Sequence, residues 1–224
     1  MPSQIRFLQL PCPTKESPTS KTATREEMRA FFQATGKTVL TFVRYSGVGY
    51  EDQAAMLTRA EHILSEFDPA KTIVNIGATP EGIGRVYEIA RQRGFVTTGI
   101  VSTQAEQAKV PLSPYVDFIF YVEDATWGGN LVGTDSLSPT SQAMVENSNI
   151  VVGFGGGEIA RDELLAAQRT GKQVRFFPAE IIIRRLKKPR SRKDCLPQRI
   201  SAERRRRCSE GRKMGRHGGR PSRK

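Results

Sequence analysis

Short apolar runs alternate with longer amphipathic segments through the middle of the chain, from Thr38 to Phe177. The runs are rich in β-branched residues and several are almost continuously apolar, as in strands that are covered on both faces. They predict six strands, at residues 38–44, 72–76, 95–101, 117–122, 149–154 and 173–177. Apolar residues recur at helical spacing in segments 51–67, 81–93 and 158–170, and Gly171 is placed to end the last helix. This alternation predicts an α/β fold: a Rossmann-like three-layer αβα domain with a mainly parallel sheet.

The two ends of the chain have a different composition. Residues 11–24 are rich in Pro, Ser, Thr and Lys, which predicts a flexible N-terminal segment over residues 1–24. Thr24 and Glu27 form a capping-box pattern that starts a helix running to about Phe32. After Ile183 the apolar periodicity stops, and Arg, Lys, Gly, Ser and Pro dominate. We therefore expect one folded domain at residues 25–183 and a disordered, basic tail at residues 184–224.

The net charge of +12 belongs to that tail. Residues 1–183 carry 17 Lys and Arg against 20 Asp and Glu, a balance of −3, whereas residues 184–224 carry 18 against 3, a balance of +15. Three interpretations of the tail remain open: sequence-independent binding of nucleic acid, a solvated extension without a specific role, and a frameshift or truncation product. Because residues 184–224 contain no aromatic residue, stacking on single-stranded nucleic acid is disfavoured.

The cysteines and the first residues of the chain give indications of the cellular compartment of the protein. Cys12, Cys195 and Cys208 are an odd number and lie outside the strand-rich middle, which suggests no disulfide framework. The first residues lack a secretory pattern, and no apolar stretch approaches the ~20 residues that span a bilayer. These features are typical of a cytoplasmic protein with no membrane partner.

The candidate chemistry lies in three glycine-rich loops, each of which follows a predicted strand. Glycine permits positive φ and lets backbone amides approach a phosphate closely, and a following helix adds unpaired N–H groups and its dipole. The carboxyl edge of a parallel sheet is also where ligands bind. Tight turns are the alternative explanation for one such loop, but three at one edge favour an anionic small-molecule site. The ligand-binding candidates in these loops are Ser46, Gly47, Gly49, Gly77, Ala78, Thr79, Gly82, Gly84, Gly155, Gly156 and Gly157.

The order of these loops between Thr38 and Glu180 resembles the SLOG superfamily, which includes LOG-type phosphoribohydrolases, molybdenum-cofactor carrier proteins and DprA proteins. In the hydrolases the last loop has the pattern Pro-Gly-Gly-x-Gly-Thr-x-x-Glu, and here the matching stretch runs from Gly155 to Glu163. Ile159 and Ala160 replace the last glycine and the threonine of that pattern. The resemblance implies a Rossmann-like nucleotide-binding domain that pairs as a homodimer.

The resemblance also implies catalytic candidates. The hydrolases use an Arg-Lys pair with the final Glu, and by ungapped counting the pair falls on Thr140 and Ser141 here. Glu163 retains the acidic position, either as a site carboxylate or as a first-turn acid that interacts with the helix dipole. Arg161 either supplies the missing cation or pairs with Asp162 or Glu158.

The tryptophan and the two histidines give weaker indications of a functional site. Trp127, the one tryptophan, either stacks on a base or is buried as a packing anchor. His62 and His217 have no partner pattern, so neither a metal site nor a His-dependent triad is predicted.

Our leading hypothesis is binding of a phosphate-bearing nucleotide or nucleotide-derived ligand without efficient hydrolysis, and with no required cofactor. The first alternative is hydrolysis of the N-glycosidic bond of a nucleoside 5′-monophosphate by Glu163 and Arg161. The second is nucleic-acid binding through the tail at residues 184–224.

Overall fold

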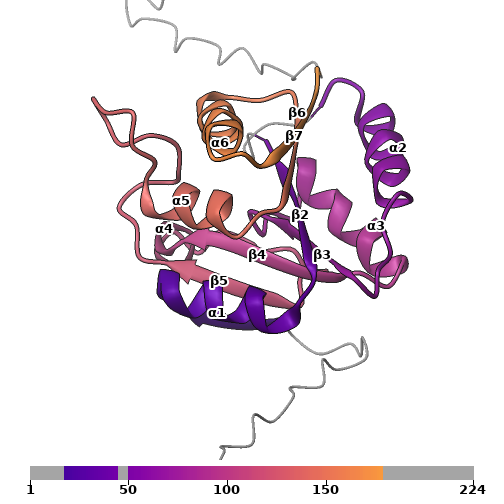
Figure 1. Cartoon of the computed structure of the whole chain (residues 1–224), viewed down its shortest axis with the longest axis horizontal. Helices are drawn as coiled ribbons and strands as arrows, with labels where there is room; N and C mark the ends of the chain where they lie inside the picture. Colours follow the sequence, from indigo (N-terminus) through magenta and orange to yellow (C-terminus); the bar gives the residue numbers. More distant parts are fainter. Residues whose placement is uncertain (1–17, 45–49, 179–224) are drawn as a thin grey trace, which may run out of the picture. The chain divides into compact units, whose positions relative to one another are not determined.

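The computed structural model describes residues 18–44 and 50–178, which all belong to one unit, Met1–Ile183 (Figure 1). The predicted basic tail and residues 1–17 lie outside the described residues.

A single parallel sheet of seven strands organises these residues, in the order β1-β5-β4-β3-β2-β6-β7. The strands are β1 (Thr19–Thr22), β2 (Thr38–Val43), β3 (Thr72–Ile76), β4 (Val96–Ser102), β5 (Phe118–Val122), β6 (Ile150–Phe154) and β7 (Gln173–Phe177). Every pairing between neighbours is parallel, for example Val43 beside Gly153 and Ile76 beside Gly99. The predicted α/β class is therefore confirmed.

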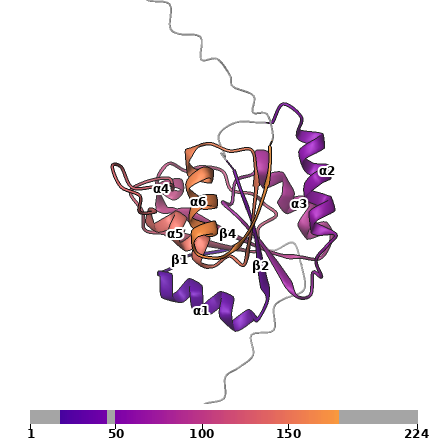
Figure 2. The same ribbon diagram turned by 45° about the horizontal axis from the view of Figure 1, so that its top comes forward.

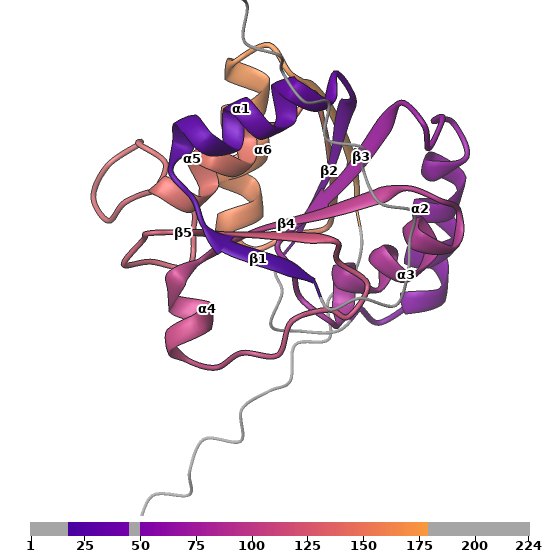
Figure 3. The same cartoon turned by 90° about the horizontal axis from the view of Figure 1, so that it is seen from below.

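Helices cover both faces of this sheet and make the three expected layers (Figures 1 and 2). One apolar cluster joins the sheet to α2 (Gln53–Leu64), α3 (Val86–Gln92) and α4 (Thr103–Gln107). A second cluster joins the other face to α1 (Arg25–Thr35), α5 (Pro139–Glu146) and α6 (Glu158–Arg169). From below, α1 and α4 are seen on opposite sides of β1 and β5 (Figure 3).

Local signals account for several boundaries. Thr24 and Glu27 form the predicted capping box at the start of α1, and Gly171 has the predicted left-handed conformation (φ 74°) just after α6. The helix predicted from residue 51 begins later, at Gln53, because the Asp52 side chain caps the amide of Ala55. The helix predicted at residues 81–93 begins as a 3-10 turn, η1 (Gly82–Arg85), before α3.

The N-terminal segment differs from the expectation of a flexible lead-in through residue 24. Thr19–Thr22 forms the edge strand β1, which pairs with β5 from Thr19 beside Phe118 to Thr22 beside Tyr121. This four-residue strand is exposed throughout and has no apolar alternation. Its stability comes from backbone pairing with β5, which a hydrophobic pattern does not reveal.

Candidate functional site

The three glycine-rich loops leave the same edge of the sheet. They follow β2, β3 and β6, and these strands are parallel neighbours in the order β3-β2-β6. The helix after β2 packs in one apolar cluster and the helix after β6 in the other, so the chain changes faces between these two strands. Such a switch point opens a crevice at the carboxyl ends of the strands, which is the usual ligand position in this architecture.

The loop between β6 and α6 exposes backbone at this edge of the sheet. Gly155 is left-handed (φ 60°), and its amide donates to the Phe177 carbonyl oxygen at 2.8 Å, which extends the pairing with β7. Gly156 is exposed, and Gly157 is the N-cap residue of α6. Within the described residues, no side chain caps this helix. The positive end of a 12-residue helix therefore begins at an exposed glycine turn.

The loop between β3 and α3 is held largely by its own packing. A Cβ built on Gly84 would lie 1.7 Å from the Thr79 carbonyl oxygen, so the turn requires glycine there. Ala78 is left-handed (φ 56°) and buried, and its amide donates to the Tyr87 hydroxyl at 3.2 Å. Gly82 is left-handed and buried as well. Gly77 and Thr79, which are half-buried, form the more accessible part of this loop.

Of the first loop, Ser46, Gly47 and Gly49 lie outside the described residues, but its flanks are described. The Arg44 guanidinium stacks 3.2 Å from the ring centroid of Tyr50, and the Tyr50 hydroxyl donates to the Phe154 carbonyl oxygen at 3.4 Å. Burial lowers the pKa of Arg44 and raises that of Tyr50.

Arg44 is a cation at the switch point to which the sequence pattern assigned no role. The sequence feature that could have indicated Arg44 is a basic residue at the end of an otherwise apolar predicted strand, residues 38–44. The side chain is only 7% exposed. The neighbouring helix α2 starts with the Asp52 carboxylate at its N-cap, which makes that helix end less suited to an anion than the start of α6.

Glu163 is buried beneath a glycine segment. Its Oε1 accepts a hydrogen bond from Ser141 Oγ at 2.7 Å, and Ser141 Oγ in turn accepts from the Gly129 amide at 2.7 Å. A Cβ on Gly128 would lie 2.9 Å from Ser141 Oγ and 4.0 Å from Glu163 Oε1, so glycine allows the close approach. Burial raises the pKa of Glu163 to about 7, although the hydrogen bond from Ser141 opposes this change.

Arg161 and Asp162, the two residues before Glu163, also form polar contacts within the protein. Arg161 forms an ion pair with Asp162 at 2.9 Å, which is one of the pairings that the sequence left open. The other Asp162 oxygen accepts the Asn130 amide at 3.0 Å. The first turns of α6 thus hold the segment around residue 129, and both Glu163 and Arg161 have protein partners.

Trp127 lies at the start of that segment. Its side chain is 52% exposed, so it is not a buried packing anchor.

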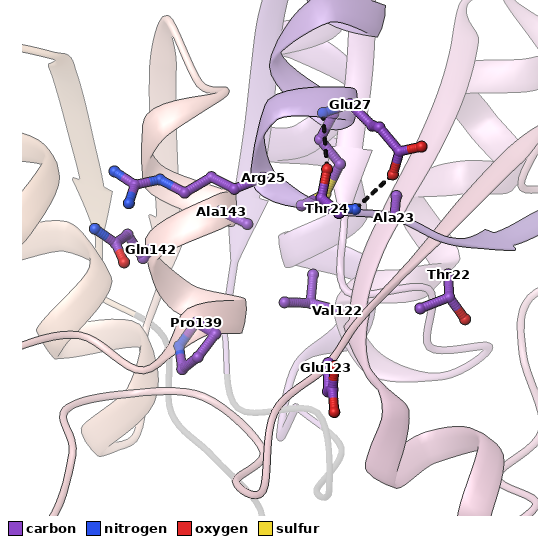
Figure 4. Close-up of a pocket in the computed structure, with 11 residues that line it drawn as sticks. Thr22, Ala23, Thr24, Arg25, Glu27, Val122, Glu123, Pro139, Gln142 and Ala143 are labelled. Carbon is purple, nitrogen blue, oxygen red and sulfur yellow. Dashed lines mark hydrogen bonds between the residues drawn. The ribbon is translucent and has the colours of Figure 1, made fainter.

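A separate pocket of about 270 Å³ opens at the carboxyl ends of β1 and β5, between the first turns of α1 and α5 (Figure 4). Met28, Val122 and Ala143 give it an apolar floor, and Glu27 and Glu123 lie among the polar residues of its wall. The Glu27 carboxylate accepts a hydrogen bond from the Thr24 amide at 2.7 Å. Strands β4 and β3 separate β5 from the switch point, so this pocket is not part of the glycine-loop site; Arg25 also lines the pocket and forms an ion pair with Glu146.

The described part of the chain offers neither a metal-binding cluster nor a membrane-spanning helix. No three His, Cys, Asp or Glu side chains there come together in a way that could hold a metal ion. None of its helices is long and apolar enough to cross a membrane.

Comparison with known proteins gives structural similarity alone. No family model matches the chain, and no curated protein matches it in sequence. Among solved structures, the chain is similar to TM1055, a structural-genomics target, at 19% identity and a TM-score of 0.44, over 61% of this chain and 72% of that one. It is also similar to a Moco carrier protein from Chlamydomonas reinhardtii, at 16% identity and a TM-score of 0.46, over 63% and 76% of the two chains.

Identities and TM-scores in this range leave the ligand and activity to be derived from the residues of this chain.

Proposed function

We propose that this protein binds the phosphate of a nucleotide or nucleotide-derived ligand at Gly156, Gly157 and the first turn of α6, without efficient hydrolysis. The observation that carries the proposal is the start of α6. This helix begins at the switch point, on an exposed glycine turn, with no described side chain at its N-cap. Backbone amides and the helix dipole favour an anion at such a position.

The surroundings of α6 support an anion rather than a cation or a neutral group. Arg44 directly follows the neighbouring strand β2, whose last residue, Val43, is in register with Gly153. Of the acids near the glycine turn, Asp162 and Glu163 are buried and bound to protein groups, whereas Glu158, the first residue of α6, is exposed to solvent.

The same contacts argue against hydrolysis. A carboxylate that cleaves an N-glycosidic bond must reach the sugar or an attacking water. Glu163 is 6% exposed and lies beneath Gly128, and its Oε1 accepts a hydrogen bond from Ser141. Arg161 is paired with Asp162. One observation favours the alternative of a phosphoribohydrolase: a carboxyl group with a pKa near 7 is well matched to proton transfer at neutral pH.

Calorimetric titration of the full chain with AMP and with adenosine tests binding. We expect AMP to bind at least tenfold more tightly than adenosine at physiological salt, because only AMP carries the phosphate. Gly156→Asp places a carboxylate in the turn and should weaken AMP binding by more than about tenfold.

The matched control is Gly133→Asp, which adds the same charge at a left-handed loop position with nothing within 4 Å of the new Cβ. It should bind AMP like the wild type, and it retains the same basic tail. Equal AMP affinity in Gly156→Asp and Gly133→Asp, or equal affinity for AMP and adenosine, would overturn the proposal.

Hydrolysis is tested by incubating the protein with AMP and separating the products by chromatography. We expect no enzymatic release of adenine. Release that disappears in Glu163→Gln would establish the phosphoribohydrolase instead.

A further inference from the structure

The backbone around Trp127 is fixed on both sides of the residue. The Thr126 amide donates to Asp124 Oδ1 at 2.8 Å, and the Gly128 amide donates to Thr126 Oγ1 at 3.3 Å. The amides of Gly129 and Asn130 are bound to Ser141 and Asp162, as described above. The position of this aromatic residue is therefore set by hydrogen bonds before any ligand arrives.

Asp124 joins this support to a second helix. Its Oδ2 accepts the Thr140 amide at 2.9 Å in the first turn of α5. Burial disfavours the charged carboxylate, but the amide hydrogen bonds from Thr140 and Thr126 outweigh it and lower the pKa of Asp124. An ionised acceptor thus holds the turn that carries Trp127 at neutral pH.

These contacts place Trp127 beside the start of α6. A Cβ on Gly128 would lie 3.2 Å from Ile159 Cγ2, and a Cβ on Gly129 would lie 3.2 Å from Ile159 Cγ1. Ile159 follows Gly157 by two residues, in the first turn of α6. The backbone one residue from Trp127 therefore packs on the helix turn that the proposed phosphate site uses.

The exposure of the indole in this fixed position calls for an explanation. Asp124, Ser141 and Asp162 are all buried and bind the backbone on both sides of Trp127, yet Trp127 itself remains 52% exposed. An exposed aromatic side chain whose neighbouring backbone packs on the first turn of α6 suits a ligand that has a phosphate at one end and a planar ring at the other.

We propose that Trp127 is the stacking platform for the planar heterocycle of the ligand whose phosphate binds at Gly156 and Gly157. This inference rests on the proposed function and narrows it: the ligand class is a phosphate ester with an aromatic base, in preference to a sugar phosphate or inorganic phosphate. Stacking on an aromatic side chain tolerates different bases, because every base has a π face.

The experiment uses Trp127 as its own reporter, since it is the one tryptophan of the chain. AMP should quench the indole fluorescence of the full-length protein to saturation, whereas ribose 5-phosphate should not. Calorimetry should give AMP about tenfold tighter binding than ribose 5-phosphate. In Trp127→Ala the two affinities should become equal, with ribose 5-phosphate bound as in the wild type, and Trp127→Phe should keep most of the preference.

Val132→Ala is the matched control, because Val132 is 98% exposed in the same loop. It should leave both affinities unchanged. If Trp127→Ala keeps the full preference for AMP, the stacking role is wrong while phosphate binding stands. If neither AMP nor ribose 5-phosphate binds the wild type, the proposed function and this inference both fail.

Discussion

Replacing Gly84 by alanine separates a packing role of the second glycine loop from a ligand-binding role. The new Cβ would lie 1.7 Å from the Thr79 carbonyl oxygen and 2.6 Å from its carbon. Both are backbone atoms, so a side-chain rotation cannot relieve the clash, and η1 or the loop at residues 77–81 must shift. Overpacking costs typically 1–3 kcal/mol. We expect Gly84→Ala to lie at the upper end of this range and to lower the free energy of unfolding by about 3 kcal/mol.

Gly77→Ala in the same loop is the matched control. Nothing lies within 4 Å of its built Cβ, and its φ is not in the left-handed range. The alanine therefore fits without strain and restricts the unfolded chain, so we expect a change of less than about 1 kcal/mol, in the stabilising direction.

Urea unfolding of the two variants and the wild type, followed by circular dichroism, measures these differences. Thermal unfolding should show Gly84→Ala melting about 6–12 °C below the wild type. A Gly84→Ala protein within about 0.5 kcal/mol of the wild type would refute the packing argument, since that value is typical of neutral surface changes. Equal losses in both variants would refute it too.

Two other substitutions test buried polar contacts. Glu163 has a pKa of about 7 when folded, against an ordinary value of 4.5, so the native state holds its proton more tightly and stability falls as the pH rises from about 4.5 to about 7. Glu163→Gln should abolish this fall. The free energy of unfolding of the variant minus that of the wild type, measured with urea, should therefore increase between pH 5 and pH 8 by at most ~3 kcal/mol. A difference that does not change with pH would contradict the burial of Glu163. Tyr87→Phe removes the hydroxyl that accepts the Ala78 amide and donates to the Thr98 carbonyl oxygen at 2.7 Å. It should lower the free energy of unfolding by about 1–3 kcal/mol, and an unchanged value would show that these bonds do not hold the loop.

The strands of the sheet could be predicted from the sequence where burial on both faces leaves an apolar run. Residues 72–76 and 173–177 have the predicted bounds, three other strands differ by one residue at one end, and the strand predicted at 95–101 is shifted by one residue, to Val96–Ser102. Edge strand β1 and helix α4 were not predicted, because a polar four-residue strand and a five-residue helix carry too little periodicity. Helix α5 was not assigned either; Pro139 at its start and several buried polar residues, such as Thr140 and Ser141, obscure its apolar face.

That the glycine loops follow neighbouring strands at one edge of the sheet could be predicted from the sequence, but the contacts of the loops could not. Glycine loops after three strands indicated one edge of the sheet, and the observed strand order brings β3, β2 and β6 together. The sequence could not distinguish Gly84, which is needed because a carbonyl group lies against it, from Gly156, which is exposed. Nor could it show that Ser141, 22 residues from Glu163, binds that carboxyl group. Such pairings depend on how α5 and α6 pack, which local patterns do not encode.

The central claim is that a phosphate binds the backbone at the start of α6. Titration of the ¹⁵N-labelled protein with AMP, followed by amide chemical shifts, tests it most directly. The account predicts that the largest shifts fall on Gly156, Gly157 and Glu158 and saturate together. Unshifted amides at these three positions when AMP is saturating, with the shifts instead around Thr24 and Glu123, would contradict it.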